Sequence, residues 1–175
     1  MPKALVWENP DSDLTSDMYL VRRWSVRNAR ALELLYQGFE GVLRILHPLW
    51  LLIGYQRMER PVRVVERFIK EVLFDCRMCG HCLLGETGMS CPMNCPKELR
   101  NGPCGGVRED GGCEVVPAMC CVWIDAWTGS RHMRDGSGIF QVQSALENTR
   151  RGHSSWLREA RLTKMSLSLG KDIHQ

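Results

Sequence analysis

The sequence predicts a mainly α-helical protein with a large irregular cysteine-rich segment and few or no strands. Through the first half of the chain, apolar residues recur every three or four positions, which is the period of a helix with one apolar face. All nine cysteines of the 175-residue chain then fall between positions 76 and 121, where glycine and proline interrupt any regular period. We expect metal ligation to order that part of the chain, because it has few large apolar side chains with which to build a core.

These patterns divide the chain into four segments. Residues 1–16 are expected to form an irregular N-terminal arm, and residues 17–75 a helical segment. The cysteine-rich segment covers residues 76–128, and a C-terminal tail covers residues 129–175. A chain of 175 residues is long enough for one compact domain and too short for two domains of typical size.

Two helices are expected within residues 17–75, separated by a break at Pro48 and the IGY sequence at 53–55. Pro61 suits the first turn of the second helix. The apolar stripe of the first helix consists of Leu32, Leu35, Phe39, Val42, Leu43 and Leu46, and that of the second of Val65, Phe68, Ile69, Val72 and Leu73. Each stripe is expected to pack inside the protein or against a partner.

The end of the chain combines a short helix, a loop and a basic stretch. Trp123 and Trp127 lie at helical spacing, and the loop TGSRHMRDGSG is followed by the strand-like sequence IFQVQ. Around Trp156 the sequence is rich in arginine. We interpret residues 129–175 as a partner-docking tail, since a tryptophan among arginines is typical of an interface hot spot, and no second membrane signal accompanies it.

Charge and hydropathy exclude two classes of protein. Between positions 76 and 121 there are four Lys and Arg residues against five Asp and Glu residues, so the basic stripe of a nucleic-acid reader is missing. The longest apolar stretch, HPLWLLIG, is too short to span a membrane. The first residues also lack the pattern of a secretory signal. We therefore expect a cytoplasmic protein, in which clustered cysteines more often bind metal than form disulfides.

The cysteines are spaced C-x2-C-x2-C-x8-C-x3-C-x8-C-x8-C-x6-C-C. A C-x2-C-x2-C triple with a later Cys-Pro is typical of 4Fe–4S ligation in bacterial ferredoxins, and both Cys91 and Cys95 precede a proline. Eight ligands serve two clusters and leave one thiol over, which the spacing assigns to Cys120 or Cys121. Zinc remains the alternative, because cysteine sets also bind zinc; the odd number of thiols disfavours disulfides.

The run from Cys76 to Trp123 resembles the methylenetetrahydrofolate reductase C-terminal domain family, a cysteine-rich domain that also occurs as a small subunit partnering the flavin-bearing reductase in acetogens and some other bacteria. The resemblance covers residues 60–128 and rests on CPKELRNGPCGG, CEV and CVW. It implies two 4Fe–4S clusters and makes Cys121, directly before the Val-Trp pair, the ligand and Cys120 the extra thiol. The implied ligands are Cys76, Cys79, Cys82, Cys91, Cys95, Cys104, Cys113 and Cys121.

The resemblance also implies a function and its partners. The chain is expected to relay electrons between an external donor, such as ferredoxin or another redox subunit, and the flavin of a catalytic reductase subunit. It has no room for a (β/α)8 barrel of about 250 residues, so we expect a non-catalytic subunit. The alternatives are a zinc-stabilised structural or interaction subunit, and an electron-transfer partner of another one-carbon (corrinoid or demethylase) system.

Four further polar residues lie within the cysteine-rich segment. With nine thiols available, His81 is expected to be exposed or hydrogen-bonded instead of binding metal. Lys97, Arg100 and Arg108 are interpreted as groups that compensate cluster charge or dock an acidic partner, or as solvated surface charges.

Overall fold

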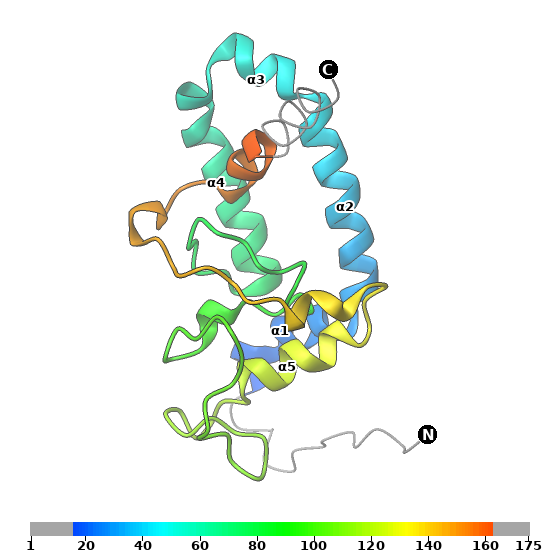
Figure 1. The fold of residues 1–175 in the computed structure, drawn as a ribbon, viewed down its shortest axis with the longest axis vertical. Coiled ribbons are helices and arrows are strands. Elements are labelled where there is room, and N and C mark those ends of the chain that lie inside the picture. The colour runs from blue at the N-terminus through cyan, green and yellow to red at the C-terminus, as the bar shows by residue number, and fades with distance from the viewer. Residues whose placement is uncertain (1–15, 163–175) are drawn as a thin grey trace.

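Helices joined by long irregular segments make up the part of the protein that the computed structural model describes, residues 16–162 (Figure 1). The α-helices are α1 (Ser16–Arg27), α2 (Ala29–Ile45), α3 (His47–Ile53), α4 (Tyr55–Phe74) and α5 (Val122–Ser130), and residues 155–162 are also helical. Short 3-10 turns occur at η2 (Pro92–Asn94), η3 (Gly136–Phe140) and η4 (Asn148–Arg150). The described residues contain no sheet, only an isolated antiparallel bridge between Gly112 and Cys120. The predicted mainly α fold is confirmed.

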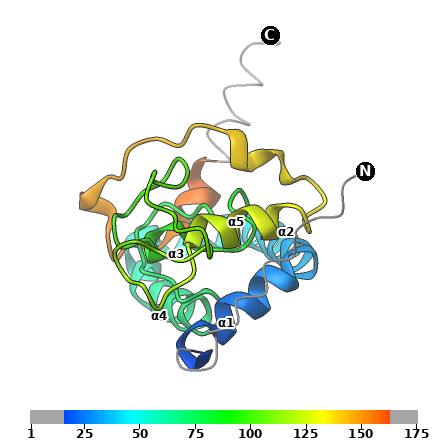
Figure 2. The same cartoon turned by 90° about the horizontal axis from the view of Figure 1, so that it is seen from below.

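The two longest helices, α2 and α4, form the sides of the molecule. α2 rises along one side, α3 crosses the top, and α4 returns along the other side (Figure 1). At the lower end α1 packs against both α4 and α5 (Figure 2). A salt bridge of 2.9 Å between Arg22 and Asp125 fastens α1 to α5.

The helical residues 155–162 fill the upper space between α2 and α4 (Figure 1). Trp156 is buried there with Leu43, Trp50 and Leu157, and its ring lies 4.3 Å from that of Phe39. The interpretation of Trp156 as an interface hot spot is therefore wrong, because its side chain is buried in an internal apolar cluster; the docking role of the tail stays a prediction. Lys164 and the rest of the tail beyond residue 162 lie outside the described residues.

The boundaries of the helices differ from the expected ones at two places. α1 and α3 are separate helices, so four helices lead into the cysteine-rich segment where two were predicted. Pro61 lies inside α4 and not in its first turn. α4 begins earlier because Gly54, at φ 92, reverses the chain after α3, and its carbonyl accepts from the N–H groups of Arg57 (3.1 Å) and Met58 (3.3 Å).

The strand-like sequence IFQVQ does not form a strand. Its first two residues close η3, and the rest is irregular. Phe140 packs edge-on against Trp127 at 5.8 Å, and Gln143 exchanges hydrogen bonds with Asn101 (2.6 and 3.0 Å). These contacts to α5 and to a loop replace the ladder that a strand needs. The predicted helix containing Trp123 and Trp127 is α5, and that prediction is confirmed.

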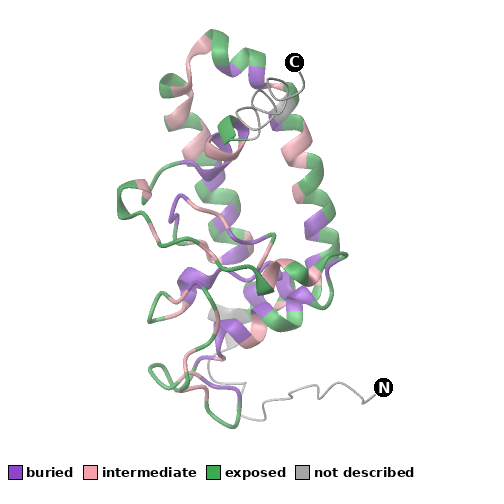
Figure 3. Cartoon of the chain, in the orientation of Figure 1, coloured by how far each residue is buried: buried purple, intermediate pink, exposed green. Residues whose placement is uncertain are grey.

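The middle of helix α4 buries two charged residues and exposes part of its apolar stripe. Glu66 and Lys70 are buried, whereas Phe68, Val65 and Val72 of the predicted stripe are exposed. Only Leu73 of that stripe packs against the core, so an internal role is wrong for most of it. Figure 3 shows the alternation of buried and exposed turns along this helix.

The apolar core continues into the cysteine-rich segment. One cluster of buried residues joins α2 and α4 to the loops: Ala29, Leu32, Phe74, Cys79, Leu84, Met89, Cys91, Met93 and Met133. The expectation that this segment lacks a core of its own is thus wrong for residues 83–93, whose leucine and methionine side chains are buried. No helix within residues 16–162 is long and apolar enough to cross a membrane.

Two candidate cysteine sites

The first cysteine pocket is lined by Cys76, Cys79, Cys82 and Cys91. Its loop starts where α4 stops: Asp75 adopts the left-handed conformation (φ 48), which turns the chain back so that the N–H of Cys76 donates to the carbonyl of Lys70 at 3.2 Å. Four of the eight predicted ligands are brought together here, next to the inner face of α4.

The second cysteine pocket is lined by Cys95, Cys104, Cys113 and Cys121. The isolated bridge at Gly112 and Cys120 shapes it. Next to that bridge, the N–H of Cys113 donates to Met119 at 2.8 Å, and the N–H of Cys121 donates to Gly111 at 2.9 Å. Cys121 is also the N-cap of α5. The remaining four predicted ligands meet in this pocket.

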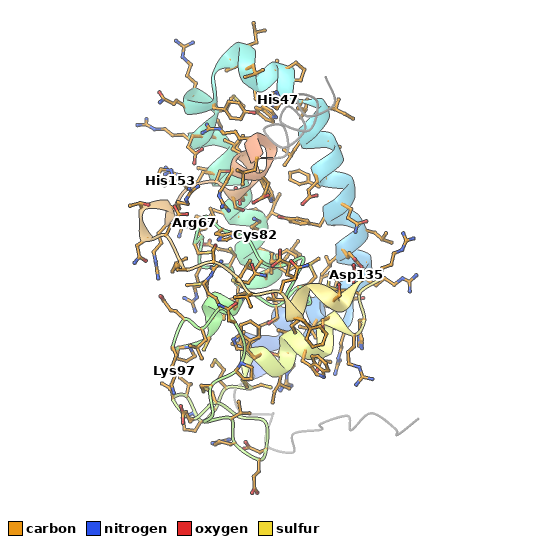
Figure 4. The ribbon with its side chains drawn as sticks, viewed as in Figure 1. His47, Arg67, Cys82, Lys97, Asp135 and His153 are labelled. Carbon is orange, nitrogen blue, oxygen red and sulfur yellow. The ribbon has the colours of Figure 1, made fainter. Side chains whose placement is uncertain are left out.

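The two pockets lie in different parts of the protein. Cys82 of the first pocket lies beside α4, whereas Lys97, which lines the second pocket, lies on the loops below it (Figure 4). All nine cysteines are free thiols. Among residues 16–162, no three His, Cys, Asp or Glu side chains converge on the position of a single metal ion.

The ninth thiol, Cys120, lines neither pocket. Its Sγ lies 3.7 Å from the carbonyl of Gly111 and 3.7 Å from a carboxylate oxygen of Asp125. Burial and the negative charge of Asp125 raise the pKa of Cys120 to about 12.

Charges inside the first pocket favour a thiolate at Cys76. A hydrogen bond from Cys91, the N–H of Met78 at 3.4 Å and the charge of Lys70 lower the pKa of Cys76 to about 7, against the effect of burial. The pKa of Cys91 moves the other way, because it donates that hydrogen bond and is fully buried. One predicted ligand of the pocket therefore has a thiol that titrates near neutral pH.

A family model described as "Methylene-tetrahydrofolate reductase C terminal" matches residues 55–149. This is more than half of the chain. The chain belongs to this family. The match spans α4, the first cysteine pocket except its C-terminal wall, the second cysteine pocket and α5. The comparisons with curated proteins and with solved structures found no match.

The family match stops just before a segment that closes the first pocket. His153 and Ser155 line that pocket, and the N–H of Gly152 donates to the carbonyl of Met78 at 2.8 Å. Gly80, at φ 73, permits the approach, since a Cβ there would lie 2.2 Å from the carbonyl oxygen of Arg150. In this member of the family, the C-terminal segment is a wall of the site.

Sequence reasoning missed three residues around the first pocket. Glu66 and Lys70 line it from α4, and Tyr36 of α2 shares a hydrogen bond with Cys82, which together with burial raises the pKa of the phenol. The signal was present in the sequence: Glu66 and Lys70 form an i,i+4 pair. Such pairs normally lie on the solvated face of a helix, so the spacing alone does not indicate that this pair lines a pocket.

The other polar residues of the cysteine-rich segment have assigned contacts. Nδ1 of His81 lies 3.1 Å from a guanidinium nitrogen of Arg100, and burial and the charges of Arg158, Arg100 and Arg150 lower the pKa of His81. Arg100 is buried and is not a solvated charge. Lys97 pairs with Glu114, and Arg108 pairs with Asp110, at the surface.

Proposed function

We propose that this chain is the iron–sulfur electron-transfer subunit of a methylenetetrahydrofolate reductase-type complex and carries two 4Fe–4S clusters. The division of its cysteines carries the proposal. Eight cysteines divide four and four between two pockets, and the ninth lies outside both. Because a 4Fe–4S cluster takes four cysteine ligands, each pocket supplies one complete set.

The donor chemistry of the two pockets fits iron–sulfur clusters. Every proposed ligand is a thiolate-forming side chain, and His81 at the rim of the first pocket is engaged by Arg100. Clusters bound in these pockets supply one-electron oxidation and reduction. Apolar side chains cover part of the first set: Leu84, Met89 and Met93 form one cluster with Cys79 and Cys91, and Cys82 packs against it.

We propose a flavin-containing catalytic subunit as the partner, and ferredoxin or another redox subunit as the electron donor. The family is named for the C-terminal part of the reductase, so its members accompany a catalytic domain. The outer face of α4 offers the contact surface, where Val64, Val65, Phe68 and Val72 are exposed. Exposed apolar patches of this kind mark interaction sites. The complex is proposed to work in the cytoplasm.

Anaerobic purification followed by metal and sulfide analysis tests the clusters. We expect a brown protein with about eight iron atoms and eight acid-labile sulfides per chain, as two 4Fe–4S clusters require. A colourless protein with stoichiometric zinc and no acid-labile sulfide would replace this proposal by the zinc-stabilised interaction subunit.

The adjacent thiols provide a matched pair of variants. Cys121→Ser removes a ligand from the second pocket and is expected to halve the iron content, to about four atoms per chain, whereas Cys120→Ser is expected to leave it unchanged. Equal iron loss in both variants, or loss only in Cys120→Ser, contradicts the assignment of Cys121 to the pocket.

Isolation of the complex tests the partner. An affinity-tagged chain is expected to copurify with a flavin-containing reductase subunit. Recovery of a corrinoid protein, with no flavoprotein, would instead assign the chain to another one-carbon system and reject the reductase complex.

A further inference from the structure

A buried ion pair lies on the inner face of α4, where an ordinary amphipathic helix carries apolar residues. Lys70 and Glu66 keep only 2% and 1% of their side-chain surface exposed, and Lys70 Nζ lies 2.8 Å from Glu66 Oε1. Burying charges is costly unless each charge is paired and hydrogen-bonded. Stabilisation of the helix therefore does not explain why this charged pair is buried.

The C-terminal segment holds both members of the pair in place. Lys70 Nζ donates to Ser155 Oγ at 2.7 Å. The Glu66 carboxylate accepts from Ser154 Oγ at 2.5 Å, from Ser155 Oγ at 2.6 Å and from the N–H of Ser155 at 3.1 Å. The carboxylate is thus surrounded by donors from the chain itself, which stabilise its negative charge locally.

Lys70 and Glu66 both face the first cysteine pocket, which they line together with Cys76 and Cys82. Burial alone would lower the pKa of Lys70, yet the negative charges of Cys82, Glu66 and Cys76 raise it above its ordinary value. Ser154 and Ser155 surround the Glu66 carboxylate with three hydrogen-bond donors, whereas Ser155 offers the Lys70 ammonium one neutral acceptor. The negative charge of the pair is thus stabilised by its own partners, and the ammonium is the charge that acts on the ligands.

We infer that the buried Lys70 ammonium, held by Glu66 and Ser155, is a positioning residue that offsets the negative charge of the ligands in the first cysteine pocket and raises the reduction potential of the cluster bound there. This inference rests on the proposed function. A positive charge favours the reduced cluster because reduction adds a negative charge, and net charge and hydrogen bonds to sulfur are established determinants of cluster potential. Because the ammonium is buried, salt screens it little.

Two substitutions of opposite sign test the inference in the full chain, purified anaerobically with its clusters. Lys70→Met removes the positive charge and is expected to lower the midpoint potential of the first cluster. Glu66→Gln keeps the shape and removes the negative charge, so it is expected to raise that potential. We expect at least a tenfold change in the equilibrium constant for reduction in each direction, which is 59 mV for a one-electron couple.

The matched control is Arg67→Gln on the same helix. Arg67 also forms an i,i+4 pair, with Glu71 at 2.7 Å, but both side chains are exposed. Its removal is expected to leave both midpoints unchanged. The midpoints are followed by redox titration with electron paramagnetic resonance, and Cys104→Ser, which alters only the second pocket, identifies the signal of each cluster.

The outcomes separate the inference from the proposed function. Absence of iron and sulfide from the unmodified chain rejects the clusters and the inference together. Intact clusters with the same potential in Lys70→Met reject the inference alone. A shift of the potential in the same direction in both variants also rejects the inference. The two substitutions remove charges of opposite sign, so an electrostatic effect requires opposite shifts, whereas a structural disturbance does not. If Lys70→Met does not retain iron, Glu66→Gln and Lys70→Arg decide: the inference requires a raised potential in the first and a nearly unchanged one in the second.

Discussion

Replacement of Phe68 by alanine is expected to weaken binding to the catalytic subunit without changing the iron content. Phe68 lies on the outer face of α4 and is 69% exposed. A phenylalanine buries roughly 200 Å² when fully covered, so its exposed part amounts to roughly 140 Å². At about 25 cal/mol per Å², complete burial by a partner contributes about 3.5 kcal/mol. Imperfect fit and the costs of association reduce this figure, so we expect Kd to rise between about tenfold and 100-fold.

The assay is calorimetric titration of the isolated flavoprotein with the variant chain, with iron and sulfide measured in the same preparations. Val142→Ala is the control, because Val142 is 90% exposed but lies in the irregular segment after η3 instead of on α4. A Kd within twofold of the unmodified chain for Phe68→Ala would refute the assignment of α4 as the docking face, and so would an equal loss in Val142→Ala.

Three further predictions concern stability and reactivity. Lys70→Met is expected to lower the free energy of unfolding by about 3–5 kcal/mol, because it leaves a buried carboxylate without its charged partner. The double variant Glu66→Gln/Lys70→Met is expected to recover most of this loss, and the exposed control Arg67→Gln to cost under about 1 kcal/mol. Denaturant unfolding of the three variants measures these free energies. In the metal-free protein, alkylation of Cys76 by iodoacetamide is expected to rise with a midpoint near pH 7, as its lowered pKa requires; a midpoint near the ordinary value of 9.0 contradicts the described pocket. Gly88→Ala is expected to destabilise the protein by more than about 1 kcal/mol, since Gly88 has φ 60 and a Cβ would lie 2.3 Å from the backbone nitrogen of Ser130; an unchanged melting temperature would contradict this packing.

The helices of the first half of the chain were predictable from the sequence, but which face of α4 points toward the interior was not. Spacing of three and four correctly places Val65, Phe68 and Val72 on one face of α4, because helical geometry alone decides which residues share a face. Whether that face points inward depends on what covers it. In α4 the neighbouring cysteine loop and the C-terminal segment cover the face that carries Glu66 and Lys70.

The eight cysteines predicted as ligands are the ones that line the two pockets, but the sequence did not predict which four line each pocket; their role as ligands stays a prediction. Local spacing groups Cys76, Cys79 and Cys82, but both Cys91 and Cys95 precede a proline and lie only four positions apart. The division depends on η2, a single 3-10 turn between these two cysteines. A short turn of this kind has no strong sequence signal. The assignment of Cys91 and Cys95 to different pockets therefore follows only from the three-dimensional path of the chain.

The wall that His153 and Ser155 give the first pocket has a consequence for how the protein is made. A ribosome synthesises the chain from its N-terminus, and domains form as their residues emerge. The second pocket needs no residue beyond Trp123, so its lining is complete while the C-terminal part is still being translated. The first pocket begins earlier in the chain but needs Ser155. The cysteines of the first pocket therefore stay accessible to solvent for longer. The first pocket starts to form before the second but is completed after it.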